Sequence, residues 1–291
     1  MPEFTPQHLS HPELFDLIPV VGDDVADIID QRAHEVASMP TAEENVTVVI
    51  RSLNEAGPLD SLLKDIERNI FSSEVQIIVV DNESSDDSSE VAKSHGAEVI
   101  NLPRGKFTHP YSLNLGMRAA AYNTVLLTVA HANLTNTQTL AAASNIFNDP
   151  DNPNAAGAFG TTVPHLNASR TERLVALGTP MAMSRKTNVQ KAGLGVLGAT
   201  NALVSKDAWK ELGYFDERYE RGGEDTLIAQ RMLDAGMTIV HDPALSVHHT
   251  HGLGPINYGR QVSQWTRTLR RPEKFDPEQW ARRRPDLNMF E

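Results

Sequence analysis

Hydrophobic and polar positions in the first half of the chain alternate between two spacings. Short apolar runs rich in β-branched residues stop at polar loops, and after each loop apolar residues recur three or four positions apart. The first spacing is typical of buried strands and the second of helices with one apolar face. The strands predicted in this way are residues 46–53, 75–80, 97–102 and 124–130, and the helices are residues 59–70, 89–95 and 111–122. Alternating strands and helices predict an α/β fold with a mostly parallel sheet and helices on both faces.

The start and the second half of the chain follow a different pattern, with fewer alternating units. The elements predicted there are helices at 22–39, 206–212 and 225–235, a strand at 238–241 and an extended run at 244–251. Apolar residues of the first of these helices share one face. We expect Gly236 to end a helix in a left-handed conformation. We also expect the Gly-rich segment 193–198 to bring the backbone close to a ligand.

These patterns divide the chain into an N-terminal extension at 1–44, one domain at 45–253 and a helical tail at 254–291. The tail holds eight Lys or Arg residues against five Asp or Glu residues. Within it, Trp265 and Leu269 lie among arginines in a predicted amphipathic helix at 258–271. Such a helix suits peripheral contact with a membrane or a homodimer interface, and the alternative is an ordinary packed helix with a solvated basic face.

Composition excludes several classes of partner and of functional site. The formal net charge of −12 argues against a general nucleic-acid binder, which needs a surplus of Lys and Arg. The chain has no cysteine, so disulfides, thiolate metal sites and cysteine nucleophiles are excluded. The first residues lack a basic segment followed by an apolar one, and no run approaches the roughly 18 apolar residues of a spanning helix. We therefore expect a cytoplasmic protein.

A carboxylate ends the wholly apolar strand at 75–80. Asp81 follows this strand directly, and the loop at 51–55 follows the preceding strand. Ligands of open parallel sheets bind beyond the carboxyl ends of the strands, so both loops are candidate ligand contacts. An acceptor at Asp81 suits the imino hydrogen of a nucleobase. The alternative is that Asp81 forms a turn or caps a helix.

The run from Val48 to Glu55, followed by residues 77–86, resembles the opening of family 2 glycosyltransferases, whose motifs read VVIPTYNE and EIIVVDDGSTD. The resemblance implies a GT-A type fold with a Rossmann-like, mostly parallel sheet, a nucleotide-binding half at 45–136 and an acceptor half at 137–253. It also implies that residues of the first half bind a nucleotide-sugar donor. They are Arg51, Ser52, Leu53, Asn54, Glu55, Asp81, Asn82, Arg104, Asn114 and His131.

Histidines stand where the family carries an Asp-x-Asp motif for a divalent metal ion. The fourth strand is followed by His131 without a nearby carboxylate, and a subset of bacterial relatives resembles this segment. In an extended run His249 and His251 point to one side and His248 to the other. His131, His249 and His251 are therefore candidate ligands of Mn²⁺ or Mg²⁺, although imidazole suits Mn²⁺ better. The alternative is that these histidines donate hydrogen bonds to the diphosphate, and His248 is expected to be structural.

Two carboxylates open the helix at 225–235. Glu224 and Asp225 follow a diglycine, which permits a tight backbone approach. Taken alone, the pair is ordinary helix capping. The surrounding residues 213–236, however, resemble a family 2 block that reads GGFDE, then ED, R and G. This resemblance implies that Asp225 is the general base, with Glu224 second, and we expect the helix N-terminus to keep the base ionised.

The resemblance covers about residues 46–252 and implies an inverting glycosyltransferase of polysaccharide biosynthesis, with a hydroxyl acceptor on a glycan, a lipid-linked sugar or a small molecule. The loop at 109–114 resembles rhamnosyltransferases, which implies a deoxyhexose donor. A lipid-linked acceptor would be met at the inner membrane face. One alternative is a catalytically silent protein that binds nucleotide sugars or glycans, because Asp-x-Asp is missing. Another is a sugar nucleotidyltransferase, although the first strand lacks a Gly-rich phosphate loop with a following lysine.

Overall fold

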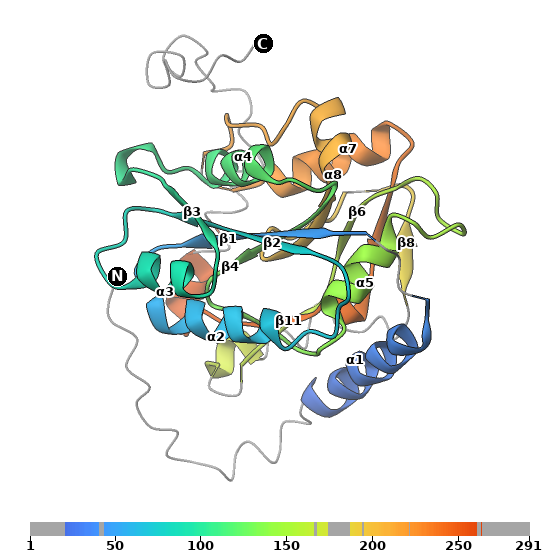
Figure 1. Cartoon of the computed structure of the whole chain (residues 1–291), viewed down its shortest axis with the longest axis horizontal. Helices are drawn as coiled ribbons and strands as arrows, with labels where there is room; N and C mark the ends of the chain where they lie inside the picture. The colour runs from blue at the N-terminus through green and yellow to red at the C-terminus, as the bar shows by residue number, and fades with distance from the viewer. Residues whose placement is uncertain are drawn as a thin grey trace.

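A computed structural model describes residues 21–40, 44–165, 168–173, 187–193, 195–220, 222–260 and 263. A twisted sheet of eight strands crosses the middle of the described chain, in the order β3-β2-β1-β4-β9-β6-β10-β8 (Figure 1). Its strands are β1 (Val46–Ser52), β2 (Val75–Asp81), β3 (Glu98–Asn101), β4 (Thr124–Val129), β6 (Ala155–Phe159), β8 (Asn188–Gln190), β9 (Asn201–Ser205) and β10 (Thr238–His241). The four strands predicted in the first half are confirmed.

The sheet is mixed, and its parallel strands share one direction. β1 pairs in parallel with β2 and β4, β2 with β3, and β6 with β10. β9 lies between β4 and β6 and is antiparallel to both, while β8 is antiparallel to β10. The carboxyl ends of β1, β2, β4 and β6 therefore meet at one edge of the sheet. This edge carries most of the predicted site residues.

Helices cover both faces of the sheet, as predicted (Figure 1). One layer contains α2 (Ala56–Glu67), α3 (Ser88–Ser94) and α5 (Thr139–Ile146), and the other contains α4 (His109–Ala119), α7 (Lys206–Glu211) and α8 (Glu224–Asp234). Alternate residues of β1 enter different cores, because successive side chains of a strand point to opposite faces. Val48 and Ile50 pack with the first layer and Val49 with the second.

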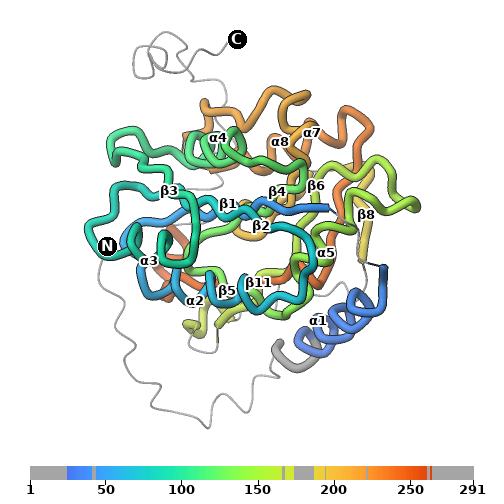
Figure 2. The backbone as a smooth tube through the Cα atoms, in the orientation of Figure 1, coloured from blue at the N-terminus to red at the C-terminus, as the bar shows by residue number. Residues whose placement is uncertain are grey.

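A second, small sheet lies on the first helix layer's side of the main sheet. It consists of β5 (Ala132–Leu134), β11 (Val247–His249) and β7 (Thr162–Val163), in the order β5-β11-β7. β5 and β11 run side by side in Figure 2, and His249 lies opposite Ala132 in their antiparallel register. The chain that leaves β4 is thus held against the last described strand. The sequence did not predict β5 or β7, because strands of two or three residues leave no clear periodicity.

Helix α1 (Val21–Ser38) confirms the helix predicted in the N-terminal extension. Its Val25, Ile29 and Val36 are buried. The guanidinium of Arg32 forms two-pronged hydrogen bonds to Asp242, with Nη2 2.8 Å from Oδ2 and Nε 3.0 Å from Oδ1. Asp242 caps the short turn η4 (Pro243–Leu245), which leads into β11. Helix α1 is therefore packed onto the segment that leads into β11.

Two sequence predictions need correction in detail. Helix α4 begins at His109 rather than at 111, because the Thr108 hydroxyl accepts a hydrogen bond from the Tyr111 backbone and Pro110 suits a first helical turn. The Gly-rich segment serves packing rather than a ligand at Gly195. A Cβ there would lie 2.4 Å from the Gln230 backbone nitrogen, so this glycine lets the segment lie against α8. Gly236 has a φ of 78° after α8, as predicted.

The described helices include none that is long and apolar enough to span a bilayer. Residues 255–260 are helical, but most of the predicted amphipathic helix at 258–271 lies outside the described residues. The predicted membrane or homodimer contact of the tail therefore stays a prediction.

Asn114 belongs to the fold rather than to the donor site, which corrects its predicted role. Its side-chain amide donates to the Phe215 carbonyl and to Glu217, both at 2.9 Å. Its oxygen accepts from the Trp209 indole and from the Phe215 backbone, both at 3.1 Å. These bonds occupy both amide hydrogens and both lone pairs of a residue that is 1% exposed. Asn114 therefore ties α4 to the segment after α7.

Replacing Asn114 with alanine is expected to lower the free energy of unfolding by about 3 kcal/mol, because buried groups of Trp209 and Phe215 lose their partners. Urea unfolding measures this change. The exposed Asn154→Ala variant is the matched control and should unfold like the native protein. Unchanged stability together with weakened nucleotide binding would restore the original assignment of Asn114.

Candidate functional site

Asp81 ends β2 at the carboxyl edge and forms a turn. It is 2% exposed, and its carboxylate accepts the Ser84 hydroxyl at 2.5 Å and the Ser84 backbone N–H at 3.0 Å. These contacts are those of a turn-forming residue, which was the alternative role of Asp81 in the sequence analysis. A carboxylate has about four acceptor positions, so Asp81 retains acceptor capacity beyond the turn.

Two buried polar atoms beside Asp81 have no partner among the described residues. They are the Ser52 hydroxyl oxygen and the Asn82 side-chain oxygen. The Asn82 backbone N–H donates to the Ser52 carbonyl at 2.9 Å, which joins the ends of β1 and β2. Buried polar groups in folded proteins are nearly always hydrogen-bonded. The pair therefore marks a place where the polar groups of a ligand would be satisfied, and both residues were predicted to contact the donor.

The remaining predicted donor residues order the loops around this place. The side-chain oxygen of Asn54 accepts the Ser85 backbone N–H at 2.7 Å, and Asn54 itself adopts a φ of 54°. Arg104 is exposed and donates its backbone N–H to Glu83 at 3.0 Å. Leu53 is half-buried. Asn54 thus fastens the first loop to the second, and Arg104 fastens the second loop to the segment that precedes α4.

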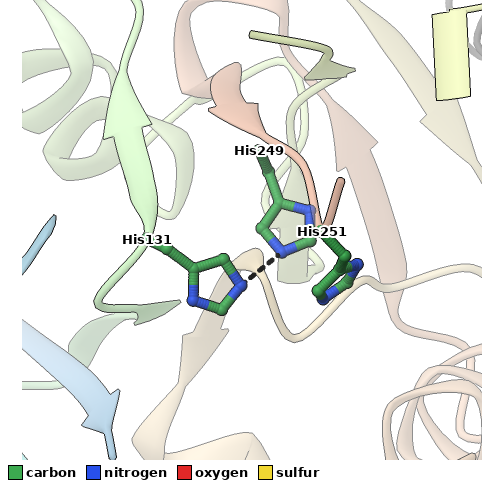
Figure 3. Close-up of side chains that lie close together, drawn as sticks. All are labelled: His131, His249 and His251. Atoms are coloured by element: carbon green, nitrogen blue, oxygen red, sulfur yellow. Dashed lines mark hydrogen bonds between the residues drawn. The ribbon is translucent and has the colours of Figure 1, made fainter. Parts of the chain in front are cut away.

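His131, His249 and His251 converge at the same edge (Figure 3). One ring nitrogen from each lies within 4.8 Å of the others, and the Nε2 atoms of His131 and His249 are 3.1 Å apart. The prediction that His249 and His251 share a side is borne out by this geometry. His248 faces away and stacks on His165, with 5.5 Å between ring centroids. The pairing of β5 with β11 brings His131 close to His249, which lies 118 residues later in the chain.

Burial favours the neutral form of His249 and His251. It lowers the pKa of His249 to about 2, with a smaller contribution from His131, and it lowers the pKa of His251 as well. Neutral imidazoles offer lone pairs, and three nitrogen donors suit a divalent transition-metal ion such as Mn²⁺ better than Mg²⁺. The residues present therefore fit a metal ion. Glu55 also belongs to this cluster, because its Oε1 lies 2.7 Å from Nδ1 of His131.

Glu224 and Asp225 open α8 after two glycines with φ values of 117° and 98°. Their environments differ. Asp225 is partly exposed and accepts backbone N–H groups of Thr226 at 2.7 Å and Ala199 at 3.3 Å. Glu224 is 3% exposed, and its Oε2 has no partner among the described residues. The ionised form of Asp225 is therefore better stabilised than that of Glu224.

Burial raises the pKa of both carboxyls and brings that of Glu224 to about 7. This effect of burial opposes the expectation that the helix N-terminus keeps the base ionised. Desolvation disfavours the charged form by more than the helix dipole and the N–H donors favour it. Because Asp225 accepts two N–H groups and Oε2 of Glu224 accepts none, the first proton that the pair takes up favours Glu224.

Arg51 contacts His109, a histidine outside the cluster, and is linked to the acid pair. Its Nη1 lies 2.9 Å from Nδ1 of His109, and its Nη2 donates to the Ala199 carbonyl at 3.3 Å. The Ala199 backbone N–H in turn donates to Asp225, so the backbone of one residue connects the guanidinium to the carboxylate. Burial lowers the pKa of Arg51, while Glu224 and Asp225 oppose this change. Its buried Nε has no partner in the described chain, which leaves one donor for a ligand.

The sequence did not single out His109 or Glu172. Burial, and then the charge of Arg51, lower the pKa of His109 to about 4, so it is a neutral partner of the guanidinium. Glu172 accepts the backbone N–H of His251 at 2.7 Å. The one signal for Glu172 is the Ser-x-x-Glu pattern from Ser169, whose reciprocal hydrogen bonds form a capping box. That pattern does not disclose the contact with His251.

Sequence comparison finds rhamnosyltransferases. The chain is 26% identical over 186 residues to the O-antigen chain rhamnosyltransferase WbaN of Salmonella anatum and 21% identical over 217 residues to RfbN of Salmonella typhimurium. These matches cover 62% and 72% of this chain. The chain spans 58% of the length of WbaN and 68% of RfbN.

Solved glycosyltransferase structures share the fold. The mannosyltransferase PcManGT from Pyrobaculum calidifontis, in complex with GDP-Man and Mn²⁺, superposes with a TM-score of 0.60 at 19% identity, over 91% of this chain and 78% of that one. TarS 1–349 of S. aureus, in complex with UDP-GlcNAc, gives 0.57 at 14% identity, over 84% and 73%. The fold is therefore of the GT-A type, as predicted. The model of glycosyl transferase family 2 matches residues 47–213. The chain belongs to glycosyl transferase family 2.

Proposed function

We propose that this protein is an inverting glycosyltransferase that moves a sugar from a nucleotide-sugar donor to a hydroxyl acceptor. The observation that carries the proposal is the asymmetric acid pair at the start of α8, which is linked through Ala199 to Arg51, whose charge also acts on His249 of the histidine cluster. A base, a fixed positive charge and neutral nitrogen ligands thus share one sheet edge. The rhamnosyltransferase relatives support a deoxyhexose donor and an acceptor on a growing polysaccharide.

The donor nucleotide is assigned to the ends of β1 and β2. The Ser52 hydroxyl and the Asn82 amide oxygen supply unsatisfied polar atoms, and Asp81 supplies acceptor positions that its turn does not use. Asn54 and Arg104 hold the two loops in place around them. The diphosphate would extend from this pocket toward Arg51, whose free Nε–H and positive charge suit a phosphate oxygen.

His131, His249 and His251 would hold a divalent transition-metal ion beside the diphosphate. When bound, such an ion supplies positive charge that stabilises the leaving nucleoside diphosphate. The histidines meet the requirement for neutral ligands because burial keeps His249 and His251 unprotonated near pH 7. The Mn²⁺ in the PcManGT complex supports a metal-dependent reaction.

Asp225 is the general base of the proposed reaction. It takes the proton of the acceptor hydroxyl as that oxygen attacks the anomeric carbon, and the bond from this carbon to the diphosphate oxygen breaks. One displacement from the opposite side inverts the anomeric configuration. Asp225 suits this role better than Glu224, because it is partly exposed and two N–H groups favour its ionised form. Glu224 stays buried and takes up the first proton of the pair.

Asp225→Asn is expected to lower the turnover of the preferred donor by at least about 100-fold while leaving donor affinity nearly unchanged, because the variant loses only proton acceptance. The assay measures release of nucleoside diphosphate from a panel of UDP-, GDP- and dTDP-sugars. Asp234→Asn, an exposed change on the same helix, is the matched control. Native protein that binds a donor and never consumes it would instead indicate a silent binding protein.

The rate is expected to fall on the acid side of neutral pH. A base must be deprotonated, and burial raises the pKa of Asp225 above its ordinary value. Activity is therefore lost as pH falls through the raised pKa of Asp225. Glu224→Gln should leave this limb of the kcat profile nearly in place, because Glu224 takes up the first proton of the pair and is already neutral when Asp225 titrates. A limb that moves clearly to lower pH in the variant contradicts the assignment of the pair.

Chelation by EDTA is expected to lower turnover by about two orders of magnitude, and Mn²⁺ should restore it better than Mg²⁺. His249→Ala should remove the Mn²⁺ dependence together with most of the activity. His248→Ala, which changes the neighbouring histidine on the opposite side of β11, serves as the control. Full activity of the native protein in EDTA would favour the histidines as hydrogen-bond donors to the diphosphate.

A further inference from the structure

The side chain of Glu55 is turned away from the helix that it precedes. Glu55 is the N-cap residue of α2, but its carboxylate makes no capping hydrogen bond. Other residues bind the backbone there: the Glu55 N–H donates to the Ser88 hydroxyl at 3.0 Å and the Ala56 N–H to Asp86 at 3.1 Å. The helix start therefore does not depend on the carboxylate of Glu55, which is free to serve another group.

That group is the imidazole of His131. Oε1 of Glu55 lies 2.7 Å from Nδ1 of His131, and both side chains are about one quarter exposed, at 26% and 27%. Nδ1 itself is buried and has no aligned hydrogen-bond partner among the described residues, so the contact with Glu55 is a close electrostatic approach rather than an aligned hydrogen bond. Glu55 is thus the acceptor next to an imidazole nitrogen that has no competing partner.

The contact favours one nitrogen of His131 as the site of the hydrogen. An ionised carboxylate can only accept, so its approach favours a hydrogen on Nδ1, and in a neutral ring Nε2 then keeps its lone pair. This Nε2 is the atom that lies 3.1 Å from His249. Metal-bound histidines in proteins commonly donate their second ring N–H to a carboxylate, which fixes the ring and raises the basicity of the ligand.

We propose that Glu55 is a positioning residue of the histidine cluster rather than a donor-binding residue. It holds His131 in the Nδ1–H tautomer with Nε2 directed at His249 and His251, and so prepares the cluster for a divalent cation. The proposal rests on the cation site of the proposed function. Because Glu55 follows Asn54, its contact with His131 also joins the loop at 51–55 to the cation site.

Glu172 supports another member of the cluster, His251. Its Oε1 accepts the backbone N–H of His251 at 2.7 Å, while its Oε2 closes the turn at Ser169 at 3.0 Å. Glu172 therefore positions main chain, whereas Glu55 acts on a ring nitrogen. A carboxylate beside a ring nitrogen can change the tautomer of a ligand, whereas one that binds a backbone N–H cannot. The tautomer of His131 therefore gives a measurement that is specific to Glu55.

The test measures metal affinity without any donor. Mn²⁺ binding is followed by electron paramagnetic resonance and Co²⁺ binding by visible absorption. Glu55→Ala is expected to raise Kd for both ions by about 10–100-fold. Glu55→Gln should lose less, because its amide oxygen still accepts a hydrogen bond from Nδ1. Glu90→Ala removes an exposed carboxylate from α3 and should bind both ions like the native protein.

Two further measurements separate positioning from general disruption. In the metal-free protein, the nitrogen shifts of His131 in an imidazole ¹⁵N spectrum should indicate the Nδ1–H tautomer, and Glu55→Ala should shift the balance toward Nε2–H. In a His131→Ala background, Glu55→Ala should cause no further loss of affinity. Thermal unfolding of each variant checks that the fold is retained.

Several outcomes overturn the proposal. They are equal affinities in Glu55→Ala and Glu90→Ala, an effect of Glu55→Ala that persists without His131, a His131 tautomer that ignores Glu55, and native protein that binds neither ion. None of these decides whether sugar transfer occurs, because the donor assay with Asp225→Asn is read independently. Failure of transfer with intact metal binding would count against the proposed function and leave the role of Glu55 standing.

Discussion

The pairing of β5 with β11 is the contact through which distant parts of the chain form one site. It places Ala132 opposite His249 and thereby brings together histidines from the end of β4 and from the last described strand. Polar side chains reinforce it, because the Thr135 hydroxyl donates to the Ser246 carbonyl at 2.9 Å and Asn136 donates to the Ala244 carbonyl at 2.9 Å. A slip of one residue would turn His249 to the other face of the small sheet. The register of a short strand pair therefore determines whether the cluster exists.

Low polarity around the site acts differently on each kind of ionisable group. Burial deprives His249 and His251 of protons, whereas it leaves a proton on the acid pair. Arg51 remains charged between them, and its interactions with both carboxylates oppose their protonation. Neutral ligands, a neutral acid and an ionised base can therefore coexist near pH 7. The same surroundings produce all three states without any residue of unusual chemistry.

Local patterns were sufficient to predict the first half of the fold and much of the site. Buried strands with β-branched residues have a clear periodicity, and β1, β2, β3 and β4 lie where that periodicity placed them. Alternation along an extended run also brought His249 and His251 to one side. The order of motifs along the chain identified the family, although each motif is loose on its own.

The parts that escaped prediction depend on contacts between distant residues. Asn114 was assigned to the donor because of its neighbours in sequence, but its partners lie about a hundred residues further on. Glu55 and Glu172 meet their histidines across 76 and 79 residues, and no periodicity records such a distance. The pKa of Glu224 is set by its burial, which a single sequence does not reveal. The sequence therefore identified the chemically reactive residues more reliably than it identified the residues that position them.

The clamp between Arg32 and Asp242 means that the folding unit and the family match have different boundaries. The match begins at residue 47, after α1 has ended, yet Asp242 is 1% exposed and takes its charged partner from α1. A shortened protein that began at the match would leave this carboxylate buried without a counter-charge, directly before the turn that leads into β11. Helix α1 therefore belongs to the same folding unit as the residues of the family match, although it precedes them in the chain.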